Sequence, residues 1–179
     1  LLILLSTAIF QNQIATHDPA KQNIRARLLP PMWVEKGSPE NIFGTDQLGR
    51  DIFSRLVYGV RISLFVGITG VILSTLIGSI LGLVSGYYGG MADALIMRFV
   101  DIFLAFPFLL LAITLVVTLG PSLRNIILVL GITGWVAYAR LVRGQTLSLR
   151  EQEYVQAARV VGASDWRIIL KHIFPNLVA

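Results

Sequence analysis

Long apolar stretches separated by shorter polar intervals dominate the chain. Three of them, residues 62–86, 95–119 and 126–142, are long enough to cross a bilayer, because a membrane-spanning helix needs roughly 20 apolar residues. Residues 1–10 are apolar throughout, but a helix of that length covers only about half of the bilayer core. We therefore expect them to be the end of an incomplete first span, and residues 175–179 to be the start of a span that the chain does not finish.

Residues 11–61 are polar and rich in proline, and we interpret them as a loop outside the membrane. Within this loop, residues 46–60 are predicted to form an amphipathic helix that lies along the bilayer interface. Thr45 or Asp46 can cap this helix. Its apolar side is formed by residues that repeat every four positions: Leu48, Ile52, Leu56 and Val60.

Small residues recur at strict four-residue intervals along the stretch at 62–86. Four helical steps return to nearly the same side of a helix, so these residues form one narrow seam. Because lipid gives apolar helices no hydrophobic reason to associate, such seams mark the faces where helix backbones approach closely. We interpret this seam as a helix-packing surface and not as a substrate site. Its members are Gly70, Ser74, Gly78, Gly82 and Gly86.

The stretch at 95–119 contains two residues that are unusual inside a membrane span, Asp101 and Pro107. Pro107 leaves the carbonyl of Phe103 without its helical donor and should bend the helix. A carboxylate inside a span is a functional hint by default. However, Asp101 lies near the helix end and can pair with Arg98. We therefore favour a structural role over ion coupling, and we keep Asp101 and Pro107 as candidates for a pore or a kink.

The polar interval after the third long apolar stretch is the most sharply patterned part of the chain. Good helix formers fill residues 153–161. Gly162 then interrupts them and can supply the positive φ angle of a tight bend. Ser164 or Asp165 can cap a second helix, which we expect to run to Phe174, with Pro175 marking its exit. The sequence therefore predicts two short helices joined by a bend.

Composition places the chain in a membrane. Of its 179 residues, 55% are hydrophobic and the mean hydropathy is +0.72, whereas soluble domains are about 45–50% apolar. The net charge of +5 fits anionic lipid headgroups or an acidic partner. No basic stripe with interleaved aromatic residues indicates nucleic acid. The sequence has no Cys and only two His, which lie far apart, so neither disulfides nor a metal site is expected.

Two stretches of the sequence resemble one family of transport proteins. A-A-R-x-x-G-A-S at 157–164, followed by H-I-x-P-N at 172–176, resembles the cytoplasmic coupling loop of permeases in binding-protein-dependent ABC importers. G-T-D-x-x-G-R-D at 44–51 resembles the branch of this family that transports dipeptides, oligopeptides or nickel. Gln156 stands where the family usually carries Glu, a change that leaves the shape of the loop intact.

The resemblance implies an all-α, polytopic helical bundle, the type-1 transmembrane domain of an ABC importer, formed by residues 62–179. It implies a multi-pass location in a bacterial or archaeal cytoplasmic membrane, with residues 143–174 as the cytoplasmic coupling loop. The orientation also follows from the resemblance, because basic residues are nearly balanced between the two sides. The residues that it assigns to coupling are Gln156, Ala157, Ala158, Arg159, Gly162, Ala163, Ser164, Asp165 and Pro175.

The partners of the chain follow from the same resemblance. They are a second homologous permease subunit, two cytosolic ABC ATPase subunits, an external substrate-binding protein and the lipid bilayer, but no nucleic acid. The sequence lacks the phosphate-binding motif G-x-x-x-x-G-K-[ST]. We therefore expect the chain to bind no cofactor and to catalyse no reaction, with ATP and Mg bound by the partner ATPases.

Two other functions are weighed against the importer. An ion-coupled secondary transporter or channel would rest on Asp101 and the Pro107 helix alone, without the several ionisable groups and the internal repeat that such proteins carry. An intramembrane hydrolase would need G-x-S-x-G, H-E-x-x-H or paired buried carboxylates, which the sequence lacks. An importer permease accounts for more of the chain, and its substrate stays open among dipeptides, oligopeptides, glutathione and nickel complexes.

Overall fold

The computed structural model describes residues 2–178, and over this range the secondary structure is helical apart from one isolated antiparallel bridge between Thr45 and Asp51. The chain divides into two units, residues 1–67 and residues 68–179. The predicted all-α class is thereby confirmed.

The first unit contains short helices and the start of a long one. They are α1 (Leu2–Ile9), α2 (Gln11–Ile14), a 3-10 helix (Ile24–Ala26) and the first part of α3 (Ile52–Tyr88). The carboxylate of Asp46 organises the turn before α3. It accepts the backbone N–H groups of Leu48 and Arg50 at 2.8 and 3.0 Å and forms ion pairs with Arg50 and Arg55. Desolvation raises the pKa of Asp46, but these donors outweigh it and lower the pKa to about 2.

Helix α3 begins at Ile52, so the helix predicted at 46–60 is wrong at its start. Asp51 provides the cap: its Oδ2 accepts the backbone N–H of Ser54 at 2.7 Å. From there α3 continues without a break for 37 residues, about 55 Å at 1.5 Å per residue. The predicted interfacial helix and the predicted span at 62–86 are therefore parts of one helix.

The residues before α3 explain why the predicted caps are not used. Gly44 and Gly49 adopt positive φ angles of 75° and 70°, which fold this stretch into a turn. The hydroxyl of Thr45 accepts the N–H of Leu29 at 2.9 Å, and the carboxylate of Asp46 is occupied within the turn. Both side chains hold the loop together and are not available to a helix that starts at residue 46.

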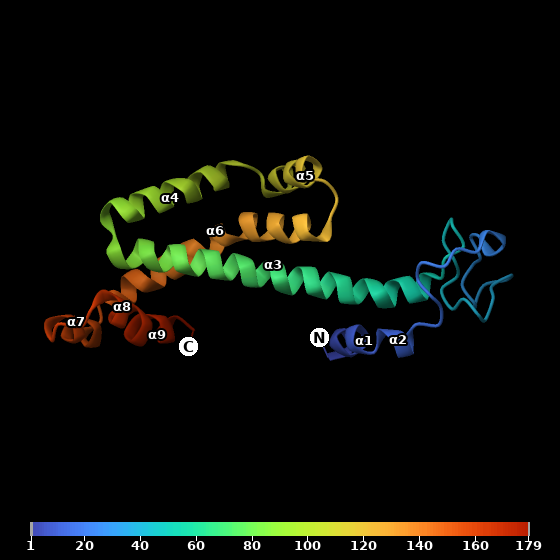
Figure 1. Cartoon of the computed structure of the whole chain (residues 1–179), viewed down its shortest axis with the longest axis horizontal. Coiled ribbons are helices and arrows are strands. Elements are labelled where there is room, and N and C mark those ends of the chain that lie inside the picture. The colour runs from blue at the N-terminus through green and yellow to red at the C-terminus, as the bar shows by residue number, and fades with distance from the viewer. Residues whose placement is uncertain (1, 179) are drawn as a thin grey trace. The chain divides into compact units, whose positions relative to one another are not determined.

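The second unit consists of long helices followed by short ones (Figure 1). After α3, the chain forms α4 (Gly90–Ala105), α5 (Phe108–Leu119) and α6 (Leu123–Arg150). It then forms α7 (Glu153–Val160), α8 (Asp165–Ile168), a π-helical turn (Ile169–Ile173) and α9 (Phe174–Val178). Helices α3 and α6 are each long and apolar enough to cross a membrane, and α4 with α5 forms a third candidate if the bent pair is one span.

The span predicted at 95–119 is broken at its proline. Helices α4 and α5 meet at an angle of 88°. Phe106 is extended, with a ψ angle of 133°, and Pro107 precedes the first residue of α5. The carbonyl of Phe103, which the proline deprives of its helical donor, accepts the N–H of Phe106 at 3.4 Å. Pro107 therefore separates two helices and does not bend one.

The small-residue seam of α3 lies against α6. A Cβ atom placed on Gly78 would lie 2.5 Å from the carbonyl oxygen of Trp135, and one on Gly82 would lie 2.6 Å from the carbonyl oxygen of Ala139. Only glycine permits such an approach of two helix backbones. Every member of the seam faces α6: Gly70, Ser74, Gly78, Gly82 and Gly86.

Candidate functional site

The candidate site is the segment at residues 153–174, named the terminal hairpin, which turns at a glycine. The N–H of Gly162 donates to the carbonyl of Arg159 and the N–H of Ala163 donates to the carbonyl of Ala158, both at 3.0 Å. This pair of bonds is the Schellman motif, whose central residue needs a positive φ angle. Gly162 has a φ angle of 85°, so the predicted bend is confirmed.

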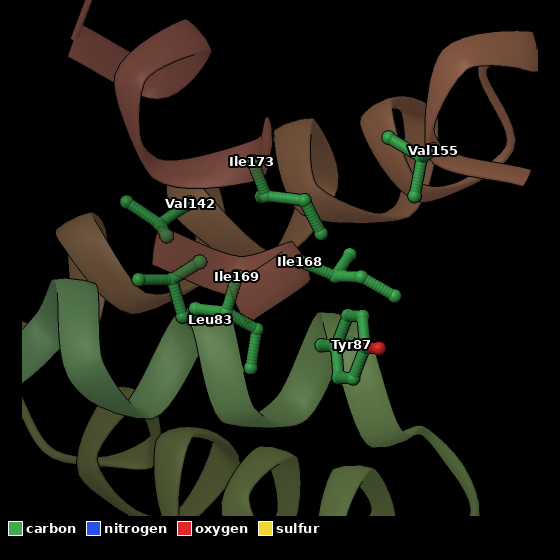
Figure 2. Packing of buried hydrophobic residues seen from close by; sticks show 7 residues of the cluster. All are labelled: Leu83, Tyr87, Val142, Val155, Ile168, Ile169 and Ile173. Carbon is green, nitrogen blue, oxygen red and sulfur yellow. The ribbon is translucent and has the colours of Figure 1, made fainter. Parts of the chain in front are cut away.

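An apolar cluster attaches the terminal hairpin to the ends of α3 and α6 (Figure 2). Val155, Ile168 and Ile173 have no exposed surface. Burying a side chain of this size stabilises a protein by roughly 1.5–3 kcal/mol, so the hairpin is firmly joined to the helix ends. The cluster comprises Leu83, Tyr87, Val142, Val155, Ile168, Ile169 and Ile173.

Polar contacts of Tyr87 reinforce this attachment. The hydroxyl of Tyr87 donates to Oδ1 of Asp165 at 2.6 Å. The guanidinium of Arg159 lies 5.8 Å from the centre of the Tyr87 ring, within the range of a cation–π contact. One residue near the end of α3 therefore contacts both helices of the hairpin.

A second polar group joins α3, α4 and α6 beside the hairpin. Arg143 donates from Nε and Nη2 to the two carboxylate oxygens of Asp93 at 2.5 and 2.6 Å, and the hydroxyl of Ser85 contacts the same carboxylate. Arg150 donates to the carbonyl of Gly86 at 2.9 Å and so satisfies one of the free carbonyls at the end of α3. Sequence reasoning missed both interactions, because the partners lie 50 and 64 residues apart.

The terminal hairpin also presents an exposed face. Val160 and Val161 are each 87% exposed and Trp166 is 69% exposed, and Ala157 and Arg159 are exposed beside them in the sequence. Large apolar side chains gathered in one short polar segment indicate an interaction surface. The hairpin thus has a buried side that contacts the helices and an exposed side suited to a partner.

Several predicted residues face the chain itself. Ala158 and Ala163 pack against the apolar cluster. Gln156 donates from Nε2 to the carbonyl of Arg150 at 3.2 Å. Ser164 stands at the N-cap of α8, but its side chain makes no capping hydrogen bond. Of the two adjacent alanines expected at a partner surface, only Ala157 is exposed.

Pro175 was predicted to mark the end of the second helix of the hairpin. It lies instead in the first turn of α9, so this prediction is wrong. The π-helical turn at Ile169–Ile173 precedes it, and the N–H of Phe174 bonds to the carbonyl of Ile169, five residues earlier. The side-chain amide of Asn176 donates to the carbonyl of His172 at 2.8 Å. The wider turn accommodates a proline, which has no N–H to give.

Asp101 was predicted to pair with Arg98, but in the structure it pairs with Arg140. Nη2 of Arg140 lies 2.7 Å from Oδ1 of Asp101, so the ion pair joins α4 to α6. Among residues 2–178 no group of three or more His, Cys, Asp or Glu side chains is arranged to hold a metal ion.

Comparison with known proteins defines the class to which these helices and this hairpin belong. The chain belongs to the family of binding-protein-dependent transport system inner membrane components, whose model matches residues 74–179, more than half of the chain. A multi-pass location in the cytoplasmic membrane follows from this family and from the apolar helices. The family recognised in the sequence is thereby confirmed.

The relatives are peptide permeases. The chain is 45% identical over its whole length to the dipeptide transport system permease protein DppC of Haemophilus influenzae. It is 46% identical over 98% of its length to the probable D,D-dipeptide transport system permease protein DdpC of Escherichia coli, and 43% identical over 98% to the oligopeptide transport system permease protein OppC of Bacillus subtilis. It covers 61%, 57% and 56% of these three relatives, less than two thirds of their length.

Proposed function

We propose that this chain forms part of a permease subunit in an ATP-driven importer of dipeptides or oligopeptides. Family membership and the transport functions of the relatives support the transport role and the substrate class. None of the relatives described above is an ion-coupled carrier or a channel, and the one carboxylate that suggested this alternative, Asp101, is held in an ion pair.

The observation that carries the proposal is the two-sided construction of the terminal hairpin. Its inner side buries Val155 and Ile168 against the ends of the long helices, and its outer side exposes Val160 and Val161. A partner that binds the outer side and then moves would therefore displace the ends of α3 and α6 with it. Rigid-body motion of packed elements is a standard way to switch between two states.

The partners in this proposal supply the chemistry. Two ATPase subunits bind the hairpins of two permease subunits, hydrolyse ATP with Mg, and change the distance between the hairpins. An external substrate-binding protein delivers the peptide. The chain itself binds no cofactor and catalyses no reaction in this scheme; it converts movement of the ATPases into movement of its helices.

Gly162 offers the most direct test of this mechanism. Gly162→Val places a β-branched residue at a φ angle of 85°, which costs about 1–2 kcal/mol. Apart from its two chain neighbours, no described residue has an atom within 4 Å of the added Cβ, so the change acts on the backbone of the hairpin. We expect normal membrane insertion of the complete permease, together with weaker ATPase co-purification and a lower ratio of dipeptide uptake to ATP hydrolysis in vesicles.

Gly162→Asn is the matched control, because Asn tolerates the left-handed conformation better than Val does. It should retain most of the co-purified ATPase and most of the uptake. If Gly162→Val shows normal co-purification, hydrolysis and uptake, the hairpin is not the transmitting element. If the unmodified complex with its binding protein takes up no dipeptide or oligopeptide, the proposed substrate class is wrong.

A further inference from the structure

An exposed ion pair joins two of the candidate membrane spans. Asp101 on α4 and Arg140 on α6 lie 2.7 Å apart, and their side chains are 62% and 53% exposed. Arg140 lies about 25 Å from the start of α6, at 1.5 Å per residue. Charged side chains within spans almost always face a bundle interior or a water-filled cavity, because lipid does not solvate them. The side of the chain that carries this pair therefore faces water or protein and not lipid.

The break between α4 and α5 adds an independent observation on the same side. Non-helical backbone at membrane depth is tolerated only where it is buried in protein or lines a water-filled cavity. Phe106 and Pro107 form such a break, and a crevice of about 320 Å³ opens beside it between α4, α5 and α6. The crevice is lined mainly by apolar side chains, among them Phe103, Leu104, Phe106 and Ala137, and Arg140 is the one charged residue of its lining.

We propose that this crevice lines the route of the transported peptide, and that Arg140 binds the peptide carboxylate while Asp101 binds its ammonium group. The inference rests on the proposed function for its substrate. The volume of the crevice falls within the range of pockets that hold small ligands. A zwitterionic peptide can replace the Asp101–Arg140 bond with two new ion pairs, so that neither charge is left without a partner, and the guanidinium suits bidentate binding of a carboxylate. The apolar lining contacts peptide side chains without selecting among them.

Water access to the crevice can be measured with single cysteines. In a complete permease with any other cysteines replaced, Leu104→Cys and Ala137→Cys test two lining residues, and Phe99→Cys is the control. Phe99 is a suitable control because it is 60% exposed, comparable to Leu104 at 52%. It is two residues from Asp101 and therefore lies on nearly the opposite side of α4, roughly 160° away. We expect a membrane-impermeant anionic thiosulfonate to label Leu104→Cys and Ala137→Cys and not Phe99→Cys, and added dipeptide with its binding protein and ATP to slow the labelling.

The charges are tested by neutralising both partners together. Asp101→Asn with Arg140→Gln keeps side chains of similar size. We expect assembled complex in normal amount but dipeptide uptake reduced roughly tenfold or more, the effect of losing at least one hydrogen bond to a charged group. Arg140→Gln alone should also lower the rate at which the anionic reagent labels Ala137→Cys, relative to the rate for a cationic reagent. Normal uptake in the double variant would overturn the assignment of the pair to the peptide termini.

The outcomes separate this inference from the proposed function. If the unmodified complex takes up dipeptides but Leu104→Cys and Ala137→Cys are unlabelled, or are labelled no faster than Phe99→Cys, the crevice is not part of the route and only this inference fails. If the unmodified complex takes up no peptide, the proposed function fails and the ligand assigned here fails with it. The labelling experiment leaves the ion pair intact, so it decides the case even if the charge variants do not assemble.

Discussion

Helix α6 and the terminal hairpin pack against α3 in different ways. Along the seam, the helices touch through glycine, with the backbone of α3 at Gly78 and Gly82 next to carbonyl groups of α6. Beyond Tyr87, the terminal hairpin is instead attached by bulky side chains such as Ile168 and Ile173, which are completely buried.

The difference agrees with the solvents expected along the chain, lipid around the predicted spans and water around the predicted coupling loop. Inside a bilayer, burying an apolar side chain gains little over lipid, so close contact of backbones supplies the attraction. At the aqueous end, removing apolar side chains from water stabilises the contact by about 25 cal/mol per Å². Packing against α3 therefore depends on the absence of side chains along the seam and on their presence at the hairpin. Adding a side chain should destabilise the first contact, and removing one should destabilise the second.

The largest effect on the assembled complex is expected for Gly78→Leu, which adds volume where the nearest atoms are backbone atoms of Trp135 and Ala139 and the Cβ atom of Tyr138. Overpacking commonly costs about 1–3 kcal/mol, and we expect the upper end or more because a backbone cannot rotate away as a side chain can. The amount of assembled complex extracted in detergent, and its thermal stability, should fall sharply.

Gly67→Leu on the same helix is the control, since among the described residues no atom lies within 4 Å of the added Cβ. Equal stability of Gly78→Leu and Gly67→Leu would show that the seam is not a packing surface.

An effect confined to the terminal hairpin, and therefore smaller on the amount of assembled complex, is expected for Ile168→Ala. Removing a fully buried side chain leaves a cavity and costs about 2–5 kcal/mol. The hairpin should loosen while α3 and α6 stay packed, which hydrogen exchange of α7 and α8 in the purified complex would detect.

Trp166→Ala, whose side chain is 69% exposed, should leave hydrogen exchange of the free permease unchanged and should weaken ATPase attachment. If the two variants behave alike, the division into an inner and an outer side is wrong.

The smallest effect is expected for Tyr87→Phe. It removes the hydrogen bond to Asp165 but keeps the ring that packs in the apolar cluster, at a cost of about 1 kcal/mol. Hydrogen exchange of α8 should rise slightly, by less than in Ile168→Ala. A larger change than in Ile168→Ala would mean that the polar contact, and not apolar packing, holds the hairpin.

Features set by local sequence were predictable. Four-residue spacing located the seam, and a glycine between two helix-forming stretches located the bend at Gly162, because each depends only on residues close together in the chain. The apolar stretches predicted the positions of the spans. They did not predict that Pro107 separates two helices that meet at 88°.

Interactions between distant residues could not be predicted. Asp93 with Arg143, and Asp101 with Arg140, depend on how α4 is rotated and shifted along α6, which spacing within one helix does not determine. The start of α3 was missed for a related reason: Asp46 is a good capping residue, but its carboxylate is already bonded within a turn that Gly44 and Gly49 make possible.

The Schellman turn has a consequence for how such a subunit can change over evolution. Its two defining hydrogen bonds join backbone atoms, and only Gly162 has a conformation that restricts the residue type. The neighbouring Val160 and Val161 are each 87% exposed, so their side chains contribute little to packing within the described part of the chain. If the hairpin binds the ATPase as proposed, substitutions at Val160 and Val161 would change which ATPase is recognised without rebuilding the hairpin. A duplicated permease could then acquire a new ATPase partner by a few surface changes while its membrane helices stay as they are.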